Sequence, residues 1–124
     1  MKKPTNIDLG FKINFDKLWA LDLPVESVDI QYLSYNFDIP YLEEEGTDDW
    51  NLSINLLLDN LENETTHAHK MQASSLDYPI DIYNFHGNWI ILDGVHRLAK
   101  AIYEKRGTIN VRRVSEADIL LVRK

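Results

Sequence analysis

The residues best suited to chemistry lie in segment 89–101, WIILDGVHRLAKA. An apolar run stops at Asp93-Gly94, and a helical pattern starts directly afterwards. Its first turn carries His96 and Arg97, two cationic groups that the positive end of a helix dipole disfavours by about 0.3–1 kcal/mol each. An anion bound beside them would remove this conflict.

A strand, a tight turn and a helix in succession present free backbone N–H groups to a ligand. With Gly94 as the N-cap, the amides of Val95, His96 and Arg97 point out of the helix start, and glycine leaves room for close approach. Arg97 would then hold a phosphate or carboxylate with its planar fork, and His96 would donate a further hydrogen bond. In the alternative, Asp93 is the N-cap, pairs with Arg97 and satisfies the helix start itself.

Three further polar residues are candidates for binding, one within this segment and two located more than one element before it. Lys100 is one turn beyond His96 and either extends the anion site or pairs with Glu104 at the i+4 position. His67 and His69 form an H-x-H pair, which would suit a metal on a strand but diverges by about 200° on the helix expected there. Lys100 is therefore a candidate for the anion site, and a metal site at His67 and His69 is not expected.

Hydrophobic periodicity and turn residues predict the elements that position this segment. Residues 25–37 fit either a strand followed by a helix or one irregular helix, and residues 43–51 read as an exposed loop. Before the hairpin, the expected elements are a short strand at 11–15, a helix at 16–21, a helix at 54–60 capped by Ser53, and a helix at 67–74 capped by Thr66 with Met71 inward. A hairpin of strands 79–85 and 89–92 follows, and then a helix at 95–105 that buries Val95, Leu98, Ala99 and Ile102 and ends near Gly107. The last expected elements are a strand at 110–114 and a short helix capped by Ser115.

Length and composition predict a single domain over residues 1–124, with 44% hydrophobic residues. No apolar run reaches the roughly 18 residues of a membrane span, and no apolar segment follows the basic start as in a signal peptide. The chain has no cysteine, which excludes disulfides, thiolate chemistry and cysteine-bound zinc and fits a cytoplasmic location. Its net charge of −7 argues against non-specific nucleic-acid binding, although residues 97–124 are net basic.

The segment PIDIYNFHGNWIILDGVHRLAKAIYEKRGTINVRRV resembles the core of the ParB/sulfiredoxin-like superfamily. Members have a Pro-Ile strand, a glycine-containing hairpin turn, a D-G-x-H-R loop that opens a helix, a glycine after that helix and a closing strand. Pro79-Ile80, Gly87, the 93–97 loop and Gly107 match in order and spacing, within about residues 66–116. The resemblance implies an α+β domain with a small mixed β-sheet and packed helices.

The resemblance also implies a nucleotide site. In sulfiredoxins and free-serine kinases of this superfamily the loop holds the phosphates of ATP or ADP, and in partition ParB a related loop holds CTP. By resemblance, Gly94, Val95, His96 and Arg97 would contact phosphate, while Asp93 would orient the loop or help to hold Mg²⁺. Asp93 and His96 are the candidate catalytic residues.

Departures from the family patterns narrow the activity. Sulfiredoxin chemistry is excluded because Val95 occupies the cysteine position. The short acidic chain argues against a partition ParB, so a nucleotide-dependent phosphotransferase or hydrolase is expected, with a carboxylate as general base. The alternatives are a non-catalytic module that binds a protein through its acidic face and, third, a ParB-like nuclease, which the charge disfavours. The carboxylates available as a base are Glu26, Glu43, Glu44, Glu45, Asp48 and Asp49.

Overall fold

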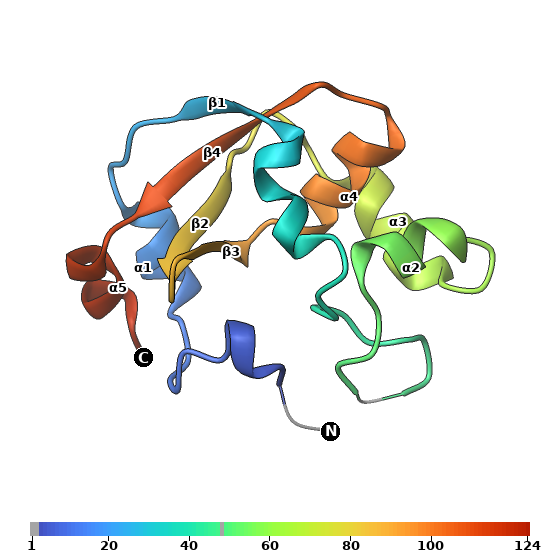
Figure 1. Ribbon diagram of the computed structural model, residues 1–124, viewed down its shortest axis with the longest axis horizontal. Coiled ribbons are helices and arrows are strands. Elements are labelled where there is room, and N and C mark those ends of the chain that lie inside the picture. Colours follow the sequence, from blue (N-terminus) through green and yellow to red (C-terminus); the bar gives the residue numbers. More distant parts are fainter. Residues whose placement is uncertain (1–2, 48) are drawn as a thin grey trace.

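The computed structural model of the chain describes residues 3–47 and 49–124. Four strands form one mixed sheet in the order β1-β4-β2-β3, with helices packed around it (Figure 1). The pairs β1–β4 and β2–β3 are antiparallel, and β2–β4 is parallel. This confirms the predicted α+β class with a small mixed sheet. The elements are η1 (Thr5–Ile7), α1 (Phe15–Ala20), β1 (Glu26–Asp29), η2 (Ile30–Asn36), α2 (Ile54–Asp59), α3 (Thr65–Ala73), β2 (Ile80–Phe85), β3 (Asn88–Asp93), α4 (Val95–Tyr103), β4 (Thr108–Val114) and α5 (Glu116–Val122).

The hairpin β2–β3 forms as its turn residues predict. His86 and Gly87 both have positive φ, 53° and 87°, which is the geometry of the two-residue turns that match the twist of paired strands. The second strand is longer than expected and reaches Asp93, which lies opposite Asp81. The hairpin therefore ends where the 93–97 loop begins.

The segment 25–37 is a strand followed by a helix, the first of the two alternatives, and its helix is of the 3-10 type. The strand expected at 11–15 is wrong. Ile13 makes a single antiparallel bridge to Arg123, and the backbone then enters α1, because Asn14 accepts the amide of Lys17 and caps the helix.

Two of the predicted helix caps are confirmed. The Ser53 side chain accepts the amide of Leu56 at the start of α2, and Ser115 accepts the amide of Asp118 at the start of α5. Asp118 returns the bond to the Ser115 amide, which completes a capping box. These caps are local, so the sequence contains all that determines them.

The cap predicted for Thr66 is wrong, because α3 begins at Thr65, two residues before the expected start, and is capped from another segment. The Glu45 carboxylate accepts the Thr65 amide at 3.1 Å and the Thr66 hydroxyl at 3.0 Å. Hydrogen bonds from Thr66 and Thr65 lower the pKa of Glu45. Glu64 accepts the Glu45 amide at 2.8 Å in return. The acidic loop is thus anchored to the start of α3, whose Met71 is buried as expected.

Strand alternation divides the core between the two faces of the sheet. Ile80, Ile82 and Val111 pack with residues of α2, α3 and α4, whereas Val114 packs with Leu18 of α1 and with residues of α5. Figure 1 shows α2, α3 and α4 grouped on one side of the sheet and α1 and α5 on the other. The first of these cores positions the 93–97 loop, since α4 is part of it.

The predicted apolar face of α4 packs inward. Leu98 and Ala99 are buried, and Val95 and Ile102 are partly buried against the same core. The helix stops at Tyr103, because Lys105 adopts a left-handed φ of 57° and its amide returns to a helix carbonyl, ahead of the glycine expected to end it. Among the described residues, no helix is both long and apolar enough to cross a bilayer.

Candidate functional site

Gly94 is the N-cap of α4 and adopts a φ of 111°, a left-handed value that residues with a side chain rarely take. A Cβ at this position would lie 3.0 Å from Cγ1 of Ile80 and 3.3 Å from its Cα. The turn from β3 into α4 therefore needs glycine for its backbone angle and for its contact with β2.

The start of α4 is not capped by any side chain of the described residues. The first hydrogen bond of the helix runs from the Leu98 amide to the Gly94 carbonyl, so the amides of Val95, His96 and Arg97 have no acceptor within the helix and are available to a ligand. A cavity of about 270 Å³, lined by residues 92–97 with Leu42 and Ser74, lies at this helix start. The interpretation with Gly94 as N-cap is confirmed, and the alternative N-cap Asp93 is wrong.

The Asp93 carboxylate is held toward α1. Its Oδ2 accepts the indole N–H of Trp19 at 2.8 Å and lies 3.7 Å from Nη1 of Arg97. The ion pair between Asp93 and Arg97, which was expected if Asp93 were the N-cap, is therefore present although Asp93 does not cap the helix. No described residues form a group of three or more side chains suited to hold a metal ion.

Arg97 lies between two cavities. Its Nη1 donates to the carbonyl of Pro79 at 3.2 Å, and its guanidinium carbon lies 5.7 Å from the centre of the Tyr78 ring. Besides the 270 Å³ cavity it lines a larger one of about 580 Å³. The larger cavity is also lined by Trp19, Leu21, Asp22, Leu23, Val25, Tyr78, Pro79, Asp81, Asp93 and Arg112.

His96 contacts a second histidine. Its Nε2 lies 3.0 Å from Nδ1 of His67, and the two ring planes are inclined by 23° with their centres 5.2 Å apart. The other nitrogen of His67 lies 2.7 Å from the Glu43 carbonyl oxygen. Burial, followed by the charges of His67 and Lys70, lowers the pKa of His96 to about 4, so the ring is neutral at neutral pH.

His67 is the site residue that sequence reasoning missed. The H-x-H pair does diverge on α3, as expected, with His67 buried and His69 exposed. The available signal was its position four residues before Met71, on the face of the helix expected to point inward, but its partner lies 29 residues away.

Lys100 reaches across to α3. Its ammonium donates to the carbonyls of Gln72, at 3.0 Å, and Ser74, at 2.6 Å, at the C-terminal end of α3. The expected pair with Glu104 is not formed, because Glu104 pairs with Arg106 at 3.0 Å. Lys100 therefore joins α4 to α3 through groups that were not anticipated.

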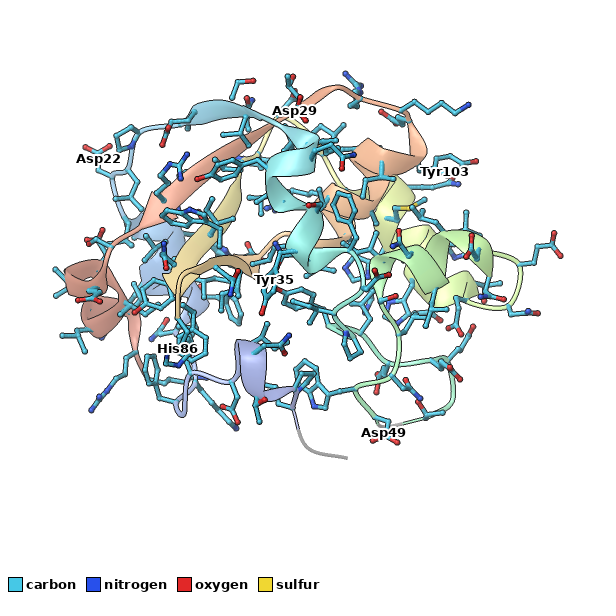
Figure 2. The ribbon with its side chains drawn as sticks, viewed as in Figure 1. Asp22, Asp29, Tyr35, Asp49, His86 and Tyr103 are labelled. Atoms are coloured by element: carbon cyan, nitrogen blue, oxygen red, sulfur yellow. The ribbon has the colours of Figure 1, made fainter. Side chains whose placement is uncertain are left out.

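The structure separates the candidate carboxylates. Glu43 and Asp49 line a cavity of about 300 Å³ together with His67, Lys70 and His96, and Figure 2 labels Asp49 on the loop before α2. Among the others, Glu45 caps α3 and Glu26 pairs with Arg113 at 2.8 Å; Asp48 lies outside the described residues.

Comparison of the chain with protein-family models, with curated proteins and with solved structures gives no match.

Proposed function

We propose that the 93–97 loop binds the phosphate groups of a nucleotide and that the chain is a nucleotide-binding domain of the ParB/sulfiredoxin-like type. The observation that carries this proposal is the uncapped start of α4, whose first amides open onto a cavity beside the Arg97 guanidinium. Backbone N–H groups at the positive end of a helix, with an arginine nearby, suit phosphate binding. The order of Pro79-Ile80, Gly87, the loop and Gly107 supports the same assignment.

The larger cavity beside Arg97 suits the remainder of a nucleotide. Its volume of about 580 Å³ falls within the roughly 300–1,000 Å³ of small-molecule sites. Trp19 and Tyr78 line this cavity and are 57% and 65% exposed, and aromatic faces stack with bases. A ligand with its phosphate at the helix start would extend past the guanidinium to these rings.

Mg²⁺ would accompany the nucleotide. This ion keeps several waters and is commonly held by one or two carboxylates and the substrate phosphates, so Asp93 fits as one ligand. The bound Mg²⁺ would offset the negative charge of the phosphates. For phosphoryl transfer or hydrolysis, Glu43 and Asp49 are the candidate bases that line a cavity together with His96.

Titration calorimetry with ATP, ADP and CTP, each with Mg²⁺, tests the proposal. We expect binding of at least one nucleotide and a loss of at least tenfold in affinity for Arg97→Ala, because a charge-assisted hydrogen bond contributes about 1.5–3 kcal/mol. Arg106→Ala is the matched control, since that arginine pairs with Glu104 on the surface. A folded wild-type protein that gives no heat with any of the three nucleotides would sink the proposal.

The same variant distinguishes the alternatives. A non-catalytic module that binds a protein through the acidic loop would keep its partner in Arg97→Ala. The structure favours the nucleotide, because Glu45 of that loop is already engaged with α3. A nuclease ranks third, because the described residues supply no cluster of three metal-ligating side chains.

A further inference from the structure

Asp81 is a buried carboxylate with one oxygen that no protein group occupies among the described residues. It lies on β2, is 2% exposed, and its Oδ1 accepts a hydrogen bond from Nε of Arg112 at 2.6 Å. Within residues 3–47 and 49–124, its Oδ2 accepts no hydrogen bond, yet it is not one of the side-chain atoms sealed from solvent. A group the size of a water molecule therefore reaches Oδ2. Because Asp81 lines the cavity of about 580 Å³, this oxygen is an acceptor for a ligand there.

Asp81 lies beside the loop that would hold the phosphates. Its Cα pairs with that of Asp93 across the hairpin, and the β2 residue before it packs against Gly94. Burial raises the pKa of Asp81 and Arg112 lowers it, and the charges of Asp93, which raises it, and of Arg97, which lowers it, also act on this carboxyl group. The carboxylate is thus a near neighbour of the acidic and the basic residue of the loop.

The sugar of a nucleotide would lie at this position. With the phosphates at the 93–97 loop and the base against the exposed rings of Trp19 and Tyr78, the ribose lies between the two. Ribose offers a pair of hydroxyl groups, and a hydroxyl that donates to a carboxylate oxygen forms a strong, charge-assisted hydrogen bond. An acidic side chain binds the ribose in this way in dinucleotide-binding folds.

We propose that Asp81 binds the ribose of the nucleotide, with Oδ2 accepting a hydrogen bond from one of the two sugar hydroxyls. Arg112 is a positioning residue, because it holds Oδ1 and leaves Oδ2 to the ligand. Its charge also offsets that of Asp81, so the carboxylate adds little repulsion toward phosphates at the loop. This inference rests on the proposed function and deepens it, since it assigns the sugar that the domain selects.

The free oxygen makes the sugar matter for affinity. An oxygen that solvent reaches is hydrated in the free protein. A nucleotide that fills the cavity displaces this water and must supply a donor in its place, because otherwise the carboxylate loses a hydrogen bond. A sugar that lacks the hydroxyl should therefore bind more weakly.

Calorimetry on the wild-type protein at pH 8 tests the inference without any substitution. The ligands are the nucleotide among ATP, ADP and CTP that binds, with Mg²⁺, and its 2′-deoxy and 3′-deoxy analogues. We expect at least one analogue to bind about tenfold or more weakly than the ribonucleotide, because a hydrogen bond to a charged acceptor is lost. If both analogues bind with nearly the affinity of the ribonucleotide, the inference is overturned.

Asp81→Asn distinguishes a contact with the sugar from a structural role. Its carbonyl oxygen can still accept from Arg112, while an amide replaces the acceptor at Oδ2. The ribonucleotide should lose affinity and the sensitive deoxy analogue should lose little, so the ratio of their affinities should fall toward one. Asp77→Asn is the control and should keep the ratio, because Asp77 is exposed next to Tyr78 and does not line the cavity.

A variant that weakens both ligands equally and leaves the ratio intact would show that Asp81 supports only the fold, and the inference would fail. If Asp81→Asn does not fold, the comparison of the analogues on the wild-type protein decides alone. The result with nucleotides also separates this inference from the proposed function. If a nucleotide binds but neither sugar hydroxyl affects its affinity, only the inference fails. If no nucleotide binds the folded protein, the proposed function fails and the inference fails with it.

Discussion

Replacing Arg112 by methionine is expected to destabilise the fold by about 3–5 kcal/mol, because it leaves a buried carboxylate without its partner. Nε of Arg112 lies 2.6 Å from the Asp81 carboxylate, and the other two nitrogens donate to the carbonyls of Leu21, at 2.7 Å, and Leu18, at 3.0 Å. Asp81 is 2% exposed and Arg112 9%. One guanidinium thus joins β4 to β2 and both to the end of α1.

The loss should depend on pH with a definite sign. Burial raises the pKa of Asp81, while the hydrogen bond and charge of Arg112 lower it, so removal of Arg112 raises it further. A carboxyl group with a raised pKa in the fold contributes stability below its unfolded pKa, and this contribution is lost as pH rises through the folded pKa. The deficit of Arg112→Met should therefore be largest at neutral pH and shrink as the pH approaches 4.

Urea unfolding followed by tryptophan fluorescence, at pH 7 and pH 4.5, measures this prediction. The double variant Arg112→Met/Asp81→Leu should regain a large part of the loss, since it removes both buried charges. Arg106→Met is the control and should lose less than about 1 kcal/mol, because its pair with Glu104 is exposed. An Arg112→Met deficit below about 1 kcal/mol that does not change with pH would refute the argument.

Two further predictions concern the loop itself. Gly94→Ala should lower the free energy of unfolding, measured by thermal unfolding, by about 2 kcal/mol or more. Alanine would be strained at the left-handed φ of 111°, and its Cβ would lie 3.0 Å from Ile80. Gly107→Ala is the control and should cost less than about 1 kcal/mol, because open space surrounds that position. His96, faced by His67 and Lys70, has a pKa of about 4 in the fold against an ordinary 6.5, so its contribution to stability is present above pH 6.5 and declines as the pH falls to 4. Urea unfolding across this range should show a shallower decline for His96→Asn than for the wild type, and parallel curves would contradict it.

The parts of the fold that sequence predicted well are those determined by neighbouring residues. Ser53 and Ser115 cap their helices through amides three residues away, and the His86-Gly87 turn specifies its own hairpin. Segment 25–37 was ambiguous because its strand is defined by pairing with β4, 79–85 positions along the chain. Periodicity within a window does not contain that partner.

The site was predicted where it is contiguous and missed where it is assembled. The 93–97 loop follows from the local order of strand, glycine and helix, and Gly94 is the N-cap as expected. The partners of its side chains come from elsewhere: Trp19 reaches Asp93 across 74 residues, and His67 reaches His96 across 29. Such contacts depend on how α1 and α3 pack against the sheet and α4, which no motif encodes.

These long-range contacts also answer why cationic residues occupy the first turn of α4. His96 is neutral because burial lowers its pKa, so it adds no positive charge at the helix start. Arg97 keeps its charge, but its guanidinium lies 3.7 Å from the Asp93 carboxylate. The electrostatic conflict is thus largely relieved within the protein, while the amides of residues 95–97 stay uncapped. A ligand at this loop would therefore be bound chiefly by backbone N–H groups, with Arg97 shared between the ligand and Asp93.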